Sequence, residues 1–273
     1  MLYLGIDGGG TGCRAAVCDA AGQILGTGQG GPANIATDPD GARQNVLQAA
    51  AEALPAGARL EDLGTVMGLA GANVAAAVLR FRQGLPLQLC RIETDAMIAV
   101  KGALGARDGV VAVIGTGSVF AQQRAGQLRE IGGWGLILGD DASGAWIGRA
   151  ILARALRAVD GFVPMTPLLQ ALIGERGGPD GIVSFASAAS PADFATLAPR
   201  IVASDDPAAR TVMAAADAAV AAALSLLGAS DALPVVFLGG LGVVFATRLQ
   251  GRWPQLSPLG SALEGALFLA RQG

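Results

Sequence analysis

Apolar runs separated by glycine-rich turns shape the first part of the chain. Residues 2–6 (LYLGI) predict a buried strand, and 14–18 (RAAVC) predict a second strand after a turn. After another turn, ILGTG predicts a third strand. Further along, amphipathic or apolar periodicity predicts helices at 41–53, 73–85 and 94–105, and strands at 64–72 and 87–93. Strands that alternate with helices indicate a layered α/β fold.

The same order of elements then recurs. Residues 109–132 again give strand, glycine turn, strand, turn and strand, which predicts two related halves. The following 144–228 is mainly helical, and 235–242 predicts a buried strand that ends in glycines. Ser257 and Pro258 predict the start of a last helix. We therefore expect an N-terminal domain at 1–105, a C-terminal domain at 106–257, and a helix at 258–271 that packs back on the first domain.

Composition narrows the function. The net charge is −3 without a charge run, which argues against nucleic acid or an anionic membrane as the main partner. The apolar stretches are broken by glycines and polar residues and no basic leader precedes the first one, so we expect a cytoplasmic protein. The chain has no histidine, which excludes Ser-His-Asp and Cys-His nucleophiles. A general base must then be a carboxylate or, as a weaker alternative, a thiol or hydroxyl.

The glycine turns suggest a phosphate site. A P-loop needs Gly-Lys-Ser/Thr, but the single lysine, Lys101, is followed by Gly102. A Rossmann turn leads into a helix, whereas GGGTG at 8–12 leads into a predicted strand. Hairpin turns that offer backbone N–H groups and a threonine hydroxyl remain, and glycine permits close approach of the phosphates.

Several motifs resemble those of a known family. DGGGT (7–11), GTGS (115–118) and LGG (238–240) are similar to the phosphate and adenosine motifs of the sugar kinase/Hsp70/actin superfamily. Further segments resemble the glucosamine and N-acetylglucosamine kinases of the BadF/BadG/BcrA/BcrD ATPase family: GPANI (31–35), GLAGA (68–72), TDA (94–96), GGWGLILGDDASGAWIG (132–148), DGFVPMTPL (160–168) and SALEGALFLA (261–270). These motifs occur in order along essentially the whole chain.

The resemblance implies two ribonuclease-H-like α/β domains around a cleft, ATP and Mg²⁺ as cofactors, and an amino sugar as substrate. It implies that Asp95 is the general base for the sugar 6-hydroxyl and that Asp7 lies near the metal. The ATP contacts that it implies are Asp7, Gly9, Gly10, Thr11, Gly115, Thr116, Gly117, Gly239 and Gly240. The sugar contacts that it implies are Asn34, Asp95, Ser118, Gly133, Trp134 and Asp140. Oligomeric state stays open, and a homodimer is one option.

Each of these residues also has a purely structural interpretation. Asp95 could be a helix N-cap, and capping could explain at least one of Asp140 and Asp141. Asn34 could be a turn residue, and Trp134 could belong to the core. Gly239 and Gly240 could simply end a strand. Gly12 stands where many relatives carry Lys or Ser, which leaves Arg14 as an optional phosphate ligand.

Two other functions compete with a kinase. A nucleotide-dependent activator or molecular switch would hydrolyse ATP without sugar; the known type carries second-half cysteines, whereas this chain has none after Cys90. A sugar sensor without catalysis would bind sugar and form no product.

Overall fold

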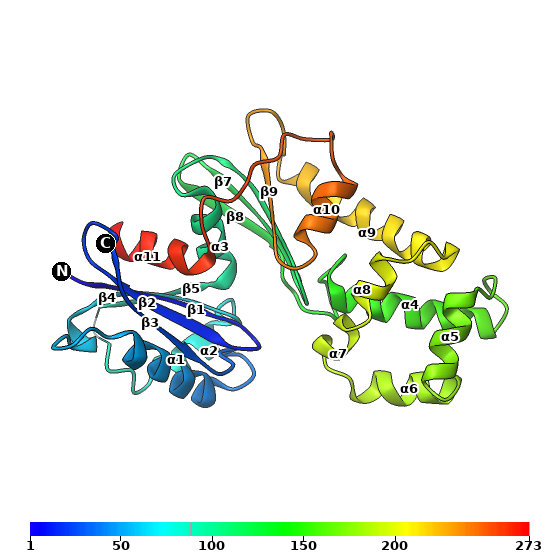
Figure 1. Ribbon diagram of the computed structural model, residues 1–273, viewed down its shortest axis with the longest axis horizontal. Helices are drawn as coiled ribbons and strands as arrows, with labels where there is room; N and C mark the ends of the chain where they lie inside the picture. The colour runs from blue at the N-terminus through cyan, green and yellow to red at the C-terminus, as the bar shows by residue number, and fades with distance from the viewer. Residues whose placement is uncertain (88, 273) are drawn as a thin grey trace. The chain divides into compact units, whose positions relative to one another are not determined.

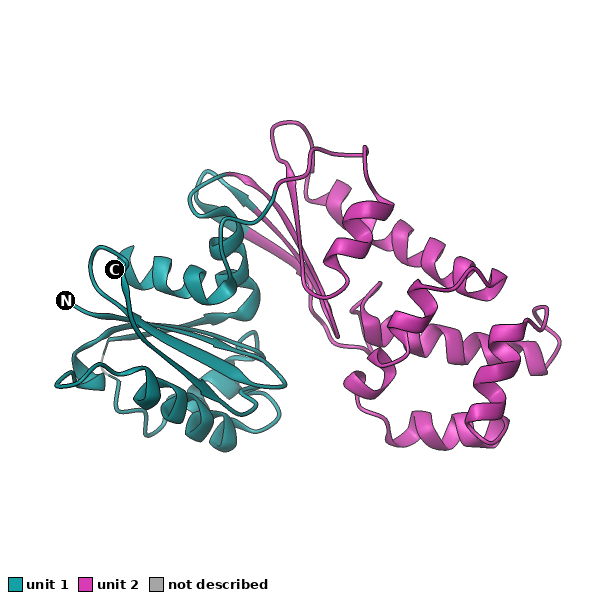
Figure 2. Cartoon of the chain, in the orientation of Figure 1, with its two compact units in different colours: residues 1–107, 123–128, 257–273 teal, residues 108–122, 129–256 magenta. Residues whose placement is uncertain are grey.

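The computed structural model describes residues 1–87 and 89–272 of the chain. Within these residues the chain divides into two compact units (Figure 2). Unit 1 comprises residues 1–107, 123–128 and 257–273, and unit 2 comprises residues 108–122 and 129–256. The described part of each unit contains a sheet with helices packed on it (Figure 1).

Unit 1 is built on a mixed sheet in the order β3-β2-β1-β4-β5. Its strands are β1 (Tyr3–Gly8), β2 (Cys13–Cys18), β3 (Ile24–Gly30), β4 (Gly64–Leu69) and β5 (Cys90–Thr94). β1, β2 and β3 form an antiparallel meander, and β1, β4 and β5 run parallel. This meander with added parallel strands is the ribonuclease-H-like pattern expected from the sequence.

Helices cover both faces of this sheet (Figure 1). They are α1 (Pro39–Ala53), the 3-10 helix η1 (Leu60–Asp62), α2 (Ala75–Arg82), α3 (Asp95–Leu104) and α11 (Ala262–Gln272). Leu4 and Ile6 point into a core formed with α1 and α2. Val66 and Ala16 point to the opposite face, where they pack with α3 and α11. Alternate residues of a strand point to opposite faces, so the near-continuous apolar strands match a sheet that is covered on both sides.

Unit 2 repeats the strand order of unit 1. Its described sheet has the order β8-β7-β6-β9, in which β6 runs parallel to β9. The strands are β6 (Gly109–Ile114), β7 (Ser118–Arg124), β8 (Gln127–Gly132) and β9 (Val235–Leu238), with the tip of the β7–β8 hairpin counted in unit 1. The first three strands and their parallel neighbour correspond to β1, β2, β3 and β4. The internal repeat inferred from the sequence is thus present in the topology.

The helices of unit 2 form one core with its sheet. They are α4 (Gly144–Val159), α5 (Pro167–Glu175), α6 (Pro179–Ala188), α7 (Pro191–Ala195), α8 (Ala198–Val202), α9 (Pro207–Leu226) and α10 (Gly242–Arg248). α9 and α10 contact the strands, and α5, α6, α7 and α8 pack against α4. α9 is long and apolar enough to cross a membrane by length and composition. Its buried side chains, including Val212, Met213 and Leu224, join the core of unit 2. α9 therefore has the packing of a core helix.

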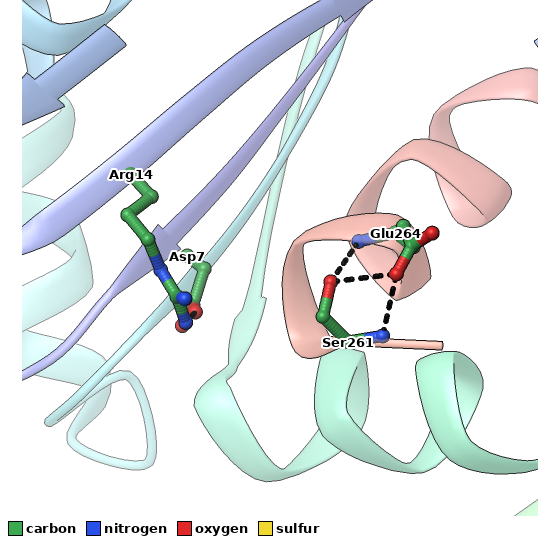
Figure 3. Close-up of polar contacts among 4 residues, drawn as sticks. All are labelled: Asp7, Arg14, Ser261 and Glu264. Atoms are coloured by element: carbon green, nitrogen blue, oxygen red, sulfur yellow. Dashed lines mark hydrogen bonds and ion pairs between the residues drawn. The ribbon is translucent and has the colours of Figure 1, made fainter. Parts of the chain in front are cut away.

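Two sequence expectations need adjustment. The C-terminal helix begins at Ala262 and not at Pro258, because Ser261 and Glu264 form the capping contacts (Figure 3). The preceding residues Leu259 and Gly260 instead donate backbone hydrogen bonds to the last turn of α3. The strand predicted at 87–93 includes residue 88, which lies outside the described residues, and β5 begins at Cys90.

Candidate active site

The glycine turn of unit 1 is the loop of a hairpin. β1 and β2 pair up to Gly8 and Cys13, and the Gly9 N–H donates to the Gly12 carbonyl at 2.9 Å. The Gly9 carbonyl accepts the N–H of Ala33, and the Gly8 carbonyl accepts that of Ala70. The turn therefore lies at the carboxyl edge of the parallel strands, beside the loops that follow β3 and β4. Gly10 and Thr11 at its tip are exposed.

Asp95 lies at the same edge of the sheet. It is the first residue of α3, directly after β5, but it does not cap the helix. The N-cap is Thr94, whose hydroxyl accepts the N–H of Met97 at 3.1 Å. Asp95 Oδ1 accepts the adjacent N–H of Ala96 at 3.0 Å. The capping interpretation of Asp95 is therefore wrong.

Electrostatics distinguish Asp95 from an ordinary surface acid. Surrounding protein atoms desolvate its carboxylate and raise its pKa, and the nearby charge of Asp7 raises it further. The backbone N–H of Ala96 opposes this rise. The residue is nevertheless open to solvent, so a ligand that covers it would desolvate the carboxylate further. A carboxylate with a raised pKa is a better proton acceptor.

Asp7 has an arginine partner (Figure 3). Arg14 lies directly opposite Asp7 in the hairpin register, and its Nη2 is 2.6 Å from Asp7 Oδ2. The Arg14 side chain is 61% exposed, whereas that of Asp7 is 16% exposed. Arg14 was expected at most as a phosphate ligand, and this pair was not predicted. The signal that could have found it is the hairpin register, which pairs residues equally distant from the turn.

Asn34 is held by its own loop. Its Oδ1 accepts the N–H groups of Ala36 at 3.0 Å and Thr37 at 3.3 Å, which makes it a turn asparagine. The neighbouring N–H of Ile35 donates to the Ala70 carbonyl, which fixes this loop beside the end of β4. The interpretation of Asn34 as a turn residue is therefore correct for its side-chain oxygen. Its amide nitrogen takes no part in these two turn hydrogen bonds.

The second glycine turn, in unit 2, is tied to a helix. The Gly115 N–H donates to Gly117, and the carbonyls of Gly115 and Thr116 accept the N–H groups of Gly144 and Ala145. These donors belong to the first turn of α4, whose N-cap is Ser143. Neither aspartate before the helix caps it, so the capping explanation of Asp140 or Asp141 is wrong. Thr116 stays exposed at the tip.

Asp140 supports the loop that follows β8. Its Oδ1 accepts the N–H of Gly135 at 3.1 Å, and its own φ of 54° is in the left-handed region. Burial raises the pKa of Asp140, against the lowering effect of backbone N–H groups from Gly135 and Ser118. Ser118 is buried, and its hydroxyl donates to the Asp141 carbonyl at 2.8 Å. Asp140 and Ser118 thus both fix this loop in position.

Trp134 projects from this loop into solvent. It is 70% exposed, which excludes the core interpretation. Gly133 precedes it with a φ of 70°, and Gly139 packs against its Cβ atom. An indole exposed on a fixed loop is suited to stack on a sugar face.

The motif glycines separate into two groups. Gly239 has a φ of 84°, and a Cβ there would collide with the Ile114 carbonyl; Gly117 lies against Asp140. The fold itself needs Gly239, whereas at Gly117 a Cβ would have to displace the Asp140 carboxylate. Gly10, Gly115 and Gly240 have no left-handed φ, and a Cβ would meet nothing within 4 Å. Neither backbone conformation nor packing requires glycine at these three positions.

The carboxylates can hold Mg²⁺ only when water or phosphate oxygens supply further ligands. The described residues hold no group of three or more His, Cys, Asp or Glu side chains that could bind a metal ion by themselves. Mg²⁺ usually keeps several waters and takes one or two carboxylates together with substrate phosphates. Asp7 beside an open glycine turn fits that kind of site.

One edge of the unit 1 sheet thus holds six of the predicted site residues: Asp7, Gly9, Gly10, Thr11, Asn34 and Asp95. Within unit 2, the Gly115–Ser118 turn adjoins Asp140 and the Gly239–Gly240 turn, because the Leu241 N–H donates to Ile114 just before that turn. Gly133 and Trp134 lie in the loop held by Asp140. Sequence reasoning missed the capping roles of Thr94 and Ser143, although both have the N-cap pattern of a hydroxyl residue before an apolar helix.

Comparisons with known proteins agree with this fold. The sequence profile of the BadF/BadG/BcrA/BcrD ATPase family matches residues 4–242. A glucosamine kinase of Vibrio cholerae is 30% identical over 284 aligned positions, which cover 98% of this chain and 95% of that protein. A structure from Chromobacterium violaceum, assigned as an N-acetylglucosamine kinase, is 31% identical with a TM-score of 0.86 and covers 98% of both chains.

A structure with lower sequence identity shares the same fold. A ROK family glucokinase of Streptomyces griseus, solved with glucose and AMPPNP, has a TM-score of 0.58 at 22% identity over the full length of both chains. At that identity the likeness concerns the fold alone. The profile match and the full-length relatives establish more. This chain belongs to the BadF/BadG/BcrA/BcrD ATPase family.

Proposed function

We propose that this protein is an ATP- and Mg²⁺-dependent amino-sugar kinase that phosphorylates the 6-hydroxyl of glucosamine or N-acetylglucosamine. The observation that carries the proposal is the position of Asp95. Thr94 caps α3, so the Asp95 carboxylate does not, and it lies at the same sheet edge as the glycine turn. The full-length relatives support the substrate class, since one is a glucosamine kinase and the other is assigned as an N-acetylglucosamine kinase.

In the proposed reaction, Asp95 orients the sugar hydroxyl and accepts its proton. The hydroxyl oxygen forms a bond to the γ-phosphorus while the bond from that phosphorus to the β,γ-bridging oxygen breaks, which releases ADP. Such a transfer asks for alignment and charge neutralisation more than for covalent help. A positioned carboxylate contributes about 10²–10⁴-fold to the rate.

The other residues hold the reactants. Backbone N–H groups of the Gly9–Thr11 and Gly115–Gly117 turns would donate to phosphate oxygens, with Thr11 and Thr116 adding hydroxyls. Asp7 would hold Mg²⁺ through water, and the bound ion would neutralise phosphate charge. The backbone at Gly239 and Gly240 would lie along the adenosine. For the sugar we propose Asn34, Trp134 and the Gly133 backbone as contacts. Asp140 and Ser118 would act mainly by fixing the loop, because their polar atoms already have partners there.

An ADP-release assay tests this function. Mg-ATP would be combined with glucosamine, N-acetylglucosamine, glucose, N-acetylmannosamine or no sugar, with Asp95→Asn as the matched inactive control. Strong stimulation by one amino sugar supports the kinase and identifies its substrate. Sugar-independent ADP release would favour the activator ATPase, and sugar binding without product would favour the sensor. We expect a cytoplasmic enzyme that needs no nucleic acid or membrane, and size-exclusion chromatography would test for a homodimer.

A further inference from the structure

Arg14 is paired with Asp7, the carboxylate for which we propose a role in metal binding. Asp7 and Arg14 are directly opposed residues of an antiparallel pair, so their side chains lie on the same face of the sheet. Because Gly5 on that face packs against Leu267 of α11, this is the face covered by α3 and α11. Asp95 begins α3 and is close enough to Asp7 for their charges to interact. The Arg14 guanidinium is therefore paired with one carboxylate, Asp7, whose charge also acts on Asp95.

We propose that Arg14 is the resident counter-ion of Asp7 in the metal-free protein, and that Mg²⁺ must displace it before Asp7 can serve the metal. The inference deepens the proposed function and rests on it for the role of the metal. In the free protein, Arg14 balances the charge of Asp7. When the metal binds, the metal balances that charge instead.

The geometry of the pair suits such an exchange. Arg14 reaches Asp7 with a single nitrogen, Nη2, on a single oxygen, Oδ2. A bidentate pair would be harder to open. The guanidinium end is also largely exposed, so water can solvate Arg14 when it leaves. Exposed ion pairs are weak, and a weak pair can hold a carboxylate in place without preventing metal entry.

The test measures metal binding with the phosphate ligands supplied and without sugar. Mn²⁺ would be titrated into protein saturated with a non-hydrolysable ATP analogue, with the analogue alone as the blank. Unbound Mn²⁺ would be followed by electron paramagnetic resonance, and Mg²⁺ added afterwards as competitor. We expect Arg14→Met to bind Mn²⁺ about fivefold more tightly than the wild type, the scale expected from loss of one exposed ion pair. Arg14→Gln should behave alike, and Arg14→Lys should lie nearer the wild type because it keeps the charge.

A double variant locates the effect. Asp7→Asn combined with Arg14→Met should lose the gain in affinity, because the carboxylate that the metal uses is gone. Equal Mn²⁺ affinity in wild type, Arg14→Met and Arg14→Gln would overturn the proposal, as would a gain that survives in the double variant. The ADP-release assay separates this from the function itself. Tighter metal binding by Arg14→Met in a protein without sugar-dependent turnover would keep the counter-ion role and reject the kinase.

Discussion

At the scale of single residues, Gly10 separates what the fold needs from what a ligand needs. Its φ is not left-handed and a Cβ would meet nothing within 4 Å, so Gly10→Ala should fold normally. Replacing glycine at such a position even stabilises a protein by about 0.4–1 kcal/mol, because the unfolded chain becomes less flexible. We expect an unchanged or higher melting temperature, together with a Michaelis constant for ATP raised by about tenfold or more, which costs about 1.4 kcal/mol of binding.

Gly239→Ala is the matched contrast to Gly10→Ala. This glycine also belongs to a motif, but its φ of 84° and the Ile114 carbonyl leave no room for a Cβ. Thermal unfolding should therefore show a lower melting temperature for Gly239→Ala and not for Gly10→Ala. If Gly10→Ala lost stability and kept its affinity for ATP, the phosphate role of that turn would be wrong.

Removing the charge of Asp95 should lower activity without lowering stability. Its pKa is raised in the folded state, so the charged carboxylate costs folding free energy at neutral pH, and that cost disappears below the unfolded pKa. Asp95→Asn removes the charge, and its side-chain oxygen can still accept the Ala96 N–H. We expect turnover to fall by about 10²-fold or more while the melting temperature at pH 7–8 stays equal or rises.

The pH profile provides a second check on Asp95. As pH falls through the raised pKa of Asp95, the base becomes protonated and kcat/KM of the wild type should decline. The residual activity of Asp95→Asn should lack this acid limb. An unchanged acid limb in the variant would assign the proton to another group.

At the scale of elements, the crossing of α3 and α11 holds Asp95 in place. Gly265 of α11 lies directly against the Ile98 carbonyl and the Gly102 N–H of α3, and Gly102 faces the Ser261 carbonyl. Gly265→Ala would push the helices apart, and overpacking of this kind costs about 1–3 kcal/mol. Urea unfolding followed by circular dichroism should show the loss.

The matched control for Gly265→Ala is Gly174→Ala in α5. Gly174 is also helical, but a Cβ there meets nothing within 4 Å. Alanine is favoured over glycine in a helix by up to about 1 kcal/mol, so this variant should be as stable as the wild type or more stable. Equal destabilisation by both variants would mean that the α3–α11 contact is not tight.

The elements show how far the sequence alone could be interpreted. Apolar periodicity and glycine turns predicted both hairpins and their recurrence, because strand alternation and turn chemistry are local properties. The start of α11 was wrong, because the residues from Leu259 bond to α3, a contact distant in sequence. The exposure of Trp134 was not predictable, because it depends on how Asp140 holds the loop. A hydrogen bond distant in sequence decided the first case, and the fixed conformation of a single loop decided the second.

At the scale of the whole molecule, each unit has a hydrophobic core of its own. The core of unit 2 contains residues of β6, β9 and most of its helices, and the clusters described in unit 1 contain residues of its sheet and helices. Units with their own cores can unfold in separate steps, so a single free energy of unfolding need not describe the chain. The distribution of aromatic residues makes this measurable, since Trp134, Trp146 and Trp253 all belong to unit 2 and the single tyrosine, Tyr3, belongs to unit 1.

We predict that Gly265→Ala shifts the unfolding of unit 1 alone. Tryptophan fluorescence reports on unit 2 and should give the same urea midpoint in the wild type and the variant. Circular dichroism reports on helices of both units and should show an earlier transition in the variant, with a midpoint below that of fluorescence. The two probes should differ because the clash lies between α3 and α11, both of unit 1, and the tryptophans do not pack there. Coincident midpoints that move together would instead show that the two units unfold as one cooperative body.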